Sequence, residues 1–118
     1  PHIPDKKMIF WVTRSNYLTL VEAGVKIYEY TPGFIHAKNF VCDDIVGIVG
    51  TINLDYRSLS HHFECATWIA YSEVLEDIKT DFLKTMMVSE EITLEKCKKI
   101  SYPAKLLSSI IGLFGPLL

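Results

Sequence analysis

The stretch GFIHAKNFVCDDIVGIVGTINLDYRS, residues 33–58, decides the fold that we expect for the centre of the chain. Two apolar runs that contain several β-branched residues, 36–42 and 45–50, are separated by Asp43 and Asp44, and aspartate is common in tight turns. We therefore predict a β-hairpin with an acidic tip.

Polar side chains gather at one end of this predicted hairpin. Successive side chains of a strand alternate between its two faces, so His36 and Lys38 should project the same way, roughly 7 Å apart. The second strand runs back beside the first and ends at Gly50, which should place Asn53 near His36. Gly50 would let the backbone approach closely, as a bound anion requires. Glu64, at the start of the next strand, could accept a hydrogen bond from His36 and fix its tautomer.

These residue types suit a site for a phosphate diester. Lys38 and Asn53 can donate hydrogen bonds to phosphate oxygens and offset the charge that builds on them in a transition state. Histidine can act as a nucleophile or as a general acid or base near neutral pH, so His36 is the candidate reactive group. No metal ion is required, because fixed hydrogen-bond donors can neutralise the charge on the phosphate oxygens in its place.

Each feature alone has an ordinary explanation, as an exposed strand edge, a turn or a solvated strand start. At a given starting position, the joint pattern at fixed spacing would arise by chance on the order of once in a million or less at ordinary residue frequencies. The pattern comprises His36, Lys38, Asp43, Gly50 and Asn53. The conjunction therefore favours a site.

Two neighbouring features carry weaker signals. Adjacent histidines on an extended backbone point to opposite faces, so we expect His61 and His62 to be exposed loop residues and not metal ligands. Arg57 is expected either to meet a phosphate with its planar fork or to pair with Asp55.

Composition limits the class of protein. The chain has 118 residues, of which 49% are apolar and 22% charged, as in one globular domain or less. The mean hydropathy of +0.21 indicates apolar surface that meets a partner, a membrane or further chain. The net charge of −2 argues against a general nucleic-acid binder. The three cysteines form no CxxC pair and favour reduced thiols; they are Cys42, Cys65 and Cys97.

The sequence shows no signal peptide, and no apolar run reaches the roughly 18 residues that a transmembrane helix needs. The first residue is Pro1 and not methionine. We therefore expect a soluble piece of a longer protein.

Helices and strands are expected on both sides of the hairpin. A helix should run from Pro4 and Asp5 to about Ala23, with Gly24 just after its C-cap, although residues 12–16 could interrupt it.

Strands are expected at 25–30 and 64–71, with a turn at 31–33 after the first, and a short helix at about 90–100. The order predicts an α/β fold with a mixed sheet in the middle.

A further helix should follow Ser72 as its cap, with Glu73, Glu76 and Asp77 in its first turn. Its apolar face at helical spacing comprises Leu75, Ile78, Phe82 and Met86.

In the tail, apolar residues between 106 and 114 fall on one helical face, and Gly115 and Pro116 should end that helix. We prefer packing against an absent half or a second protomer over membrane contact for this tail. Deleting residues 103–118 would separate the two.

The spacing His36-x-Lys38, four residues to Asp43 and six more to Gly50-Thr-Ile-Asn53 resembles the HxKxxxxD…GTxN motif of the phospholipase D superfamily. The wider text around it and the ending IGLFGPLL are similar to bacterial cardiolipin synthases. The resemblance covers essentially the whole chain. It implies the C-terminal portion of one phospholipase D-like domain, the second of two, with helix and sheet at about 1–72 and C-terminal helices at 73–118.

This resemblance implies an incomplete phospholipase D-like module that takes part in phosphatidyl transfer through a phosphohistidine. Two phosphatidylglycerols would give cardiolipin and glycerol at the cytoplasmic face of the bacterial cell membrane. His36 would be nucleophile or general acid, Lys38 and Asn53 phosphate ligands, and Glu64 the partner that orients His36. Asp43 would stabilise the turn.

The resemblance implies no cofactor. The implied partners are phosphatidylglycerol, the membrane surface, and the first phospholipase D half or a second protomer, but no nucleic acid. The family chemistry needs two histidines and this chain carries one motif, so we expect the isolated piece to be inactive.

Two alternatives stay open at this point. A homodimeric single-motif phosphodiesterase or nuclease would complete one site with two copies of His36, but the chain lacks a basic excess. A non-catalytic interaction module would keep the motif as a relic and use the apolar tail to dock on a membrane or protein.

Overall fold

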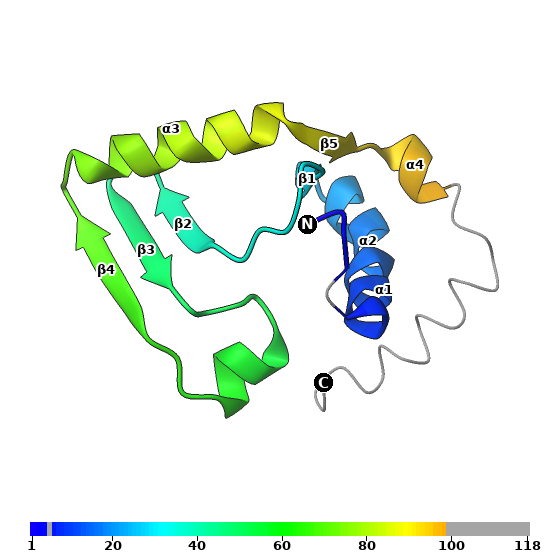
Figure 1. The fold of residues 1–118 in the computed structure, drawn as a ribbon, viewed down its shortest axis with the longest axis horizontal. Coiled ribbons are helices and arrows are strands. Elements are labelled where there is room, and N and C mark those ends of the chain that lie inside the picture. The colour runs from blue at the N-terminus through cyan, green and yellow to red at the C-terminus, as the bar shows by residue number, and fades with distance from the viewer. Residues whose placement is uncertain (5, 99–118) are drawn as a thin grey trace. The chain divides into compact units, whose positions relative to one another are not determined.

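The computed structural model describes residues 1–4 and 6–98, which fall into two compact units. The first unit holds Pro1–Phe34 and, among the described residues, 89–98; the second is Ile35–Val88. Each unit combines helices with an antiparallel sheet of its own (Figure 1). The predicted α/β class is confirmed, but the strands form two sheets and not the one expected.

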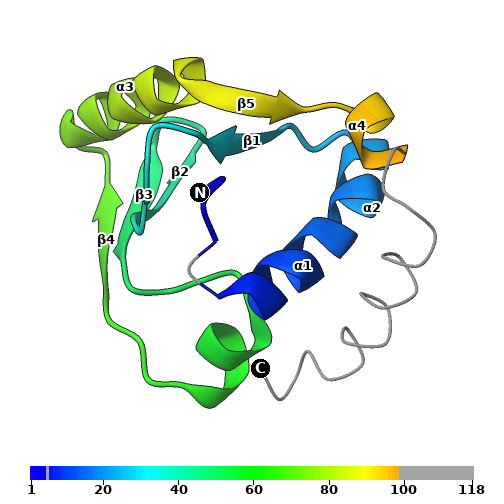
Figure 2. The ribbon, with the colours of Figure 1, turned by 45° about the vertical axis from the view of Figure 1, so that its right-hand side comes forward.

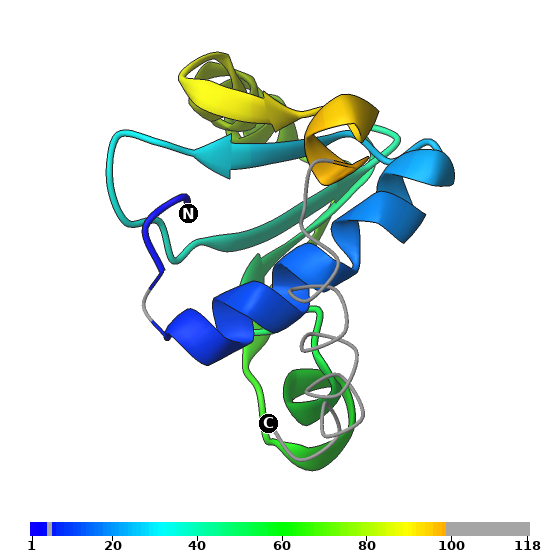
Figure 3. The same cartoon turned by 90° about the vertical axis from the view of Figure 1, so that its right-hand side faces the viewer.

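The first unit pairs two strands that lie far apart in the sequence. Its elements are α1 (Lys7–Ser15), α2 (Tyr17–Glu22), β1 (Ile27–Tyr30), β5 (Ser89–Ile92) and α4 (Leu94–Lys98). β1 and β5 are antiparallel, and α1 and α2 follow one another with a bend between them (Figure 2). Figure 3 shows α4 directly after β5.

The helix expected up to Ala23 is two helices, because Asn16 separates α1 from α2. The Ser15 hydroxyl donates to the carbonyl of Val12 (2.6 Å), and the Asn16 amide also donates to it (3.4 Å). Such side-chain bonds compete with the backbone bonds that continue a helix. The expected start at Asp5 lies outside the described residues, and α1 begins after Lys6.

The expected glycine after α2 is confirmed. Gly24 has φ +90°, and its N–H donates to the carbonyl of Val21 (3.0 Å) while that of Val25 donates to Leu20 (3.0 Å). This pair of bonds is the Schellman motif, which satisfies the last carbonyls of a helix. The left-handed φ explains why glycine stands here.

The prediction of a helix at about 90–100 is wrong for its first residues. Residues 89–92 form β5 and bond to β1, with Ile27 opposite Ile92 and Tyr30 opposite Ser89. The helix begins only after Thr93, whose hydroxyl accepts the backbone N–H of Lys96 (3.5 Å). Residues after 98, including the predicted apolar tail, lie outside the described residues.

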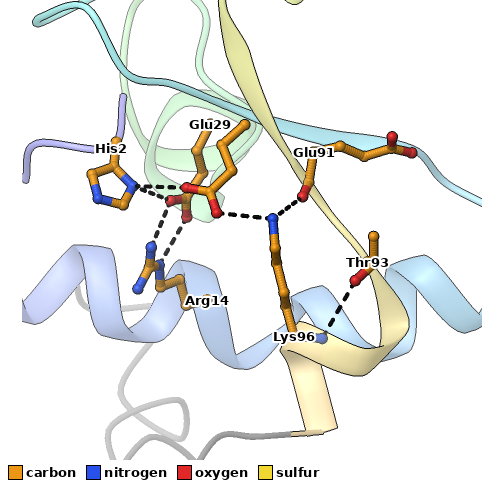
Figure 4. Close-up of polar contacts among 7 residues, drawn as sticks. His2, Arg14, Glu29, Glu91, Thr93 and Lys96 are labelled. Atoms are coloured by element: carbon orange, nitrogen blue, oxygen red, sulfur yellow. Dashed lines mark hydrogen bonds and ion pairs between the residues drawn. The ribbon is translucent and has the colours of Figure 1, made fainter.

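A carboxylate is buried at the centre of the first unit (Figure 4). Glu29, on β1, is only 2% exposed. Arg14 donates from Nε to Glu29 Oε1 (2.8 Å) and from Nη2 to Oε2 (2.5 Å), and His2 Nδ1 lies 2.8 Å from Oε2. The Arg14 guanidinium also stacks over Phe10, 4.5 Å from the ring centre. These contacts tie β1 to α1 and to the first residues of the chain.

Opposing effects act on the pKa of Glu29. Burial alone raises it, but the hydrogen bonds from Arg14 and His2 outweigh burial, so the pKa is lowered below its usual value. Tyr17 responds in the opposite direction: its burial, followed by the charge of Glu29, raises its pKa to about 12. Glu29 is therefore an anion near neutral pH, and Tyr17 stays protonated.

A second ion pair joins the C-terminal elements of this unit. Lys96, on α4, donates to Glu90 (2.8 Å) and to the backbone carbonyl of Glu91 (2.7 Å) on β5. The bonds that Lys96 makes to Glu91 and Thr93 are drawn in Figure 4.

The second unit contains the predicted hairpin. Its elements are β2 (Lys38–Cys42), β3 (Val46–Gly50), a single-turn π-helix η1 (Arg57–His61), β4 (Ala66–Ala70) and α3 (Val74–Met87). The strands lie in the order β2-β3-β4, all antiparallel (Figure 1).

The acidic tip of the hairpin is confirmed. Asp43 has φ 52° and Asp44 φ 57°, and the Ile45 N–H donates to the carbonyl of Cys42 (3.1 Å). Two successive left-handed residues match the type I′ turn that suits the twist of paired strands, and aspartate tolerates this backbone. Lys79 of α3 pairs with Asp44.

α3 packs against the three-stranded sheet near the hairpin tip. A Cβ added to Gly47 would lie 2.5 Å from Cδ2 of Leu75, which is 2% exposed. The predicted apolar face of α3 is only partly correct, because Phe82 is 60% exposed. Ser72 accepts the N–H of Val74 (3.4 Å), so it supports the start of the helix from two residues before it.

The Arg14–Glu29 pair should carry much of the stability of the first unit. Arg14→Met leaves a buried carboxylate without its main partner, and we expect a loss of about 3 kcal/mol in the free energy of unfolding at pH 7. Urea titration would measure this loss. Because protonation of Glu29 removes the penalty, the loss should shrink at pH 4.

The double variant Arg14→Met/Glu29→Gln is the matched control. It lacks the unpaired charge, so it should be more stable than Arg14→Met alone at pH 7. Equal stabilities of the two variants would contradict the buried ion pair as the cause.

Candidate functional site

The hairpin register brings the two halves of the motif to one end. Lys38, the first residue of β2, lies opposite Gly50, the last residue of β3. His36 comes just before Lys38 and Asn53 shortly after Gly50, so both backbones leave the sheet at the same end. Convergence of the side chains of His36, Lys38 and Asn53 on one phosphate stays a prediction.

Lys38 is fixed by a bond to its neighbour. Its Nζ donates to the backbone carbonyl of His36 (2.8 Å), and its side chain is half-buried. His36 itself is exposed and precedes β2, whereas the strand was expected to begin with it. The bond holds the ammonium beside the backbone of the candidate reactive residue and leaves two of its three protons for other acceptors.

Gly50 is required by the neighbouring strand. A Cβ at this position would lie 2.5 Å from Cβ and 2.6 Å from Cα of Ala66, and it would also collide with the carbonyl of Cys65. The close backbone approach inferred from the sequence is therefore real, but β4 makes it. The inferred anion is not needed to explain this glycine.

A clasp next to Gly50 ties the end of β3 to the start of β4. The Thr51 N–H donates to the carbonyl of Cys65 (3.0 Å), and the Cys65 N–H donates to the Thr51 hydroxyl (3.1 Å). The same hydroxyl donates to the carboxylate of Glu64. These bonds hold Glu64 at the end of the sheet where Lys38 begins β2.

Glu64 is an anion over a wide pH range. The hydrogen bond from Thr51, followed by one from Ser58 and the nearby His62, lowers the pKa of its carboxyl. His62 Nδ1 lies 3.4 Å from Glu64 Oε1. The predicted bond from Glu64 to His36 stays a prediction, and the partners seen here, Thr51 and His62, were given no role in the sequence. The fixed place of threonine within GTxN was the available signal for Thr51.

The remaining predicted residues lie around this centre. Asp43 sits at the hairpin tip, far along β2 from Lys38, and accepts the thiol of Cys42 (3.3 Å). Arg57 begins η1 and is exposed. The carboxylate of Asp55 accepts the N–H of Ser58 (2.7 Å), which is a different use from the predicted pair with Arg57.

His61 ends η1 and His62 follows it, so the predicted loop is in part helical. Within residues 1–4 and 6–98, no three histidine, cysteine or acidic side chains are grouped so as to hold a metal ion. Over the same residues, no helix has the length and apolarity needed to cross a bilayer. The cysteines are free thiols, and Cys97 alone among them is buried.

Gly50→Ala should test the close approach of β4. The added methyl group must displace the backbone of β4, so we expect a loss of about 1–3 kcal/mol in the free energy of unfolding, measured by urea titration. Gly33→Ala is the control, because a Cβ there meets no atom within 4 Å. Similar losses for both variants would show that strand contact is not the reason for Gly50.

Thr51→Val should raise the pKa of Glu64, because it removes the main hydrogen bond to the carboxylate. Since the pKa of Glu64 is lowered in the folded chain, this carboxylate stabilises the fold above its unfolded pKa, and the effect is lost as pH falls through the folded pKa. The variant should lose the part of the free energy of unfolding that ionised Glu64 contributes. NMR titration of the Glu64 carboxyl would measure the shift.

Thr67→Val makes the same chemical change on β4 and should leave the pKa of Glu64 unchanged. If the pKa of Glu64 is the same in the Thr51 and Thr67 variants, the hydrogen bond from Thr51 does not hold the carboxylate.

Comparison with known proteins identifies the family of the chain. The family described as "Cardiolipin synthase, PLD-like domain" matches residues 1–86. Over all 118 residues the chain is 51% identical to an uncharacterized protein of Streptococcus mutans serotype c (strain ATCC 700610 / UA159). It is 39% identical to a cardiolipin synthase of Clostridium perfringens (strain SM101 / Type A) and 36% to one of Staphylococcus aureus (strain Mu50 / ATCC 700699).

The chain spans about a quarter of these relatives, namely 26%, 25% and 24% of their lengths in the same order. No solved structure matches it. The family match covers well over half of the chain, and the relatives align over all of it. The chain therefore belongs to the phospholipase D-like domain family of the cardiolipin synthases.

Proposed function

We propose that this chain is the C-terminal portion of one phospholipase D-like domain of a phosphatidyltransferase that makes cardiolipin. In this reaction two phosphatidylglycerols give cardiolipin and glycerol. The observation that carries the proposal is the register of β2 and β3, which directs the segments of His36 and Asn53 to the end of the hairpin where Lys38 lies. The family membership supports the same conclusion.

The proposed chemistry proceeds in two displacements at phosphorus. A histidine nitrogen bonds to phosphorus while the bond from phosphorus to the glycerol oxygen breaks, and a second histidine gives that oxygen its proton. The hydroxyl oxygen of a second phosphatidylglycerol then bonds to phosphorus while the bond from phosphorus to the histidine nitrogen breaks, and the proton of that hydroxyl passes to the second histidine. His36 takes one of these two roles, and the other histidine belongs to another domain or protomer.

Lys38 and Asn53 would hold the non-bridging oxygens of the phosphate through these steps. The Lys38 ammonium uses one proton on the His36 carbonyl, so it can still donate to a phosphate oxygen beside His36. Donors fixed before the reaction stabilise the charge of the transition state without reorganisation. This supports a metal-independent displacement.

Glu64 would serve as a hydrogen-bond acceptor for an imidazole. Its lowered pKa keeps it ionised near neutral pH, as an acceptor that stabilises an imidazolium must be. Arg57 would add a planar donor for a second lipid phosphate.

The other half of the site would come from another phospholipase D-like domain or a second protomer, with the whole enzyme at the cytoplasmic face of the bacterial membrane. The isolated chain, with one motif, should be inactive.

The test is His36→Ala in the full-length enzyme, with cardiolipin formation from phosphatidylglycerol as the readout. Loss of a nucleophile or general acid should lower kcat by about 10²–10⁴-fold or more. Thr67→Val on β4, a residue with no proposed role in the site, is the control and should retain most activity. Full activity of the His36 variant would overturn the proposal.

Mass spectrometry of the enzyme trapped with substrate then assigns the role of His36. A phosphoryl adduct on His36 identifies it as the nucleophile. An adduct on another histidine, together with loss of activity in His36→Ala, identifies His36 as the general acid.

A further inference from the structure

The segment between Asn53 and Glu64 exposes several large apolar side chains. We name residues 54–63 the β3–β4 loop. Exposed fractions are 78% for Leu54, 62% for Tyr56, 62% for Leu59 and 101% for Phe63. Apolar side chains gathered in one short exposed segment mark a contact surface, because their exposure to water is unfavourable.

The β3–β4 loop is held in place at its base and by its own turn. The clasp of Thr51 with Glu64 and Cys65 closes the base of the loop. Within it, Asp55 accepts the N–H of Ser58 with its carboxylate and that of Leu59 with its carbonyl (3.0 Å). Figures 1 and 2 show the loop with its helical turn between the end of β3 and the start of β4. The apolar side chains are therefore presented by an ordered segment.

Polar side chains in the same loop fit a phospholipid headgroup layer. Arg57, His61 and His62 can all donate hydrogen bonds to lipid phosphates, and the only carboxylate, Asp55, is engaged in the turn. Tyr56 has an apolar ring with a polar tip, a combination that favours the boundary between headgroups and acyl chains. Leucine and phenylalanine on the same short segment supply the part that enters the acyl region.

We propose that the β3–β4 loop inserts its apolar side chains into the surface of an anionic phospholipid bilayer, beside the site. The inference rests on the proposed function, because a phosphatidyl group must be taken from a bilayer. The loop connects the segments that carry Asn53 and Glu64, so its insertion would bring the phosphate ligands to the depth of the headgroups. The loop thus acts as the membrane contact of this site.

The experiment compares binding of the 118-residue chain to vesicles of phosphatidylglycerol and phosphatidylcholine by co-sedimentation. Leu59→Ser/Phe63→Ser should weaken the partition coefficient by at least about tenfold, because two side chains no longer enter the acyl region. Phe82→Ser/Leu83→Ser is the matched control. It removes two exposed apolar side chains from α3 in the same unit, 60% and 44% exposed, and should bind within about twofold of the unchanged chain.

Equal binding by the loop variant and the unchanged chain would overturn the proposal, as would equal weakening in both double variants. A loop variant that changes only the oligomeric state, measured by sedimentation velocity, would assign the loop to a protein contact and also overturn it. Circular dichroism would confirm that both variants remain folded.

The outcome is independent of catalysis. Vesicle binding by the unchanged chain and by the loop variant is measured without turnover, so failure of the proposed function would leave the membrane contact measurable. Conversely, a full-length enzyme that loses activity with His36→Ala, alongside an unaffected loop variant, would reject the membrane contact alone.

Discussion

The pairing of Lys38 with Gly50 is the constraint on which the candidate site depends. A slip of one residue would exchange the two faces of β2 and turn Lys38 towards the face on which Leu75 approaches Gly47. The register is fixed at the tip, where Asp43 and Asp44 adopt the left-handed backbone of a tight turn. The turn at Asp43 and Asp44 thus fixes the position of Lys38, although the full length of β2 separates the turn from this residue.

The two glycines of β3 show how packing sets the positions of site residues. At Gly47 the space is occupied by Leu75, which seats α3 on the sheet, and at Gly50 it is occupied by the backbone of β4. The second contact brings Glu64 to the end of the hairpin, where Thr51 binds it. Because Gly50 belongs to the motif, a bound ligand would be one explanation for it, but packing against β4 is a sufficient reason. Gly50 therefore affects the candidate site indirectly, through the position of Glu64.

Local patterns predicted the hairpin, its turn and the helix end at Gly24, because each depends on residues close in the sequence. β5 was missed because residues 89–92 become a strand only by bonding to β1, some sixty positions away, and nothing in the local pattern shows this pairing. The break at Asn16 was allowed for but not placed, since competition between side-chain and backbone bonds depends on rotamers. The motif predicted His36, Lys38 and Asn53 as site residues, and the start of the next strand predicted Glu64. The clasp by Thr51 required the three-dimensional arrangement.

Two carboxylates held by hydrogen bonds, Glu29 and Glu64, have different consequences for function. Glu29 is buried and paired with Arg14, so its charge supports the fold of the first unit. Glu64 has a lowered pKa without such burial, because hydroxyl donors bind its charged form. A carboxyl that must release a proton near neutral pH needs the opposite environment, apolar and poor in donors, which raises its pKa. Glu64 is therefore suited to accept a hydrogen bond and not to act as a general acid, and proton transfer in the proposed reaction is left to histidine.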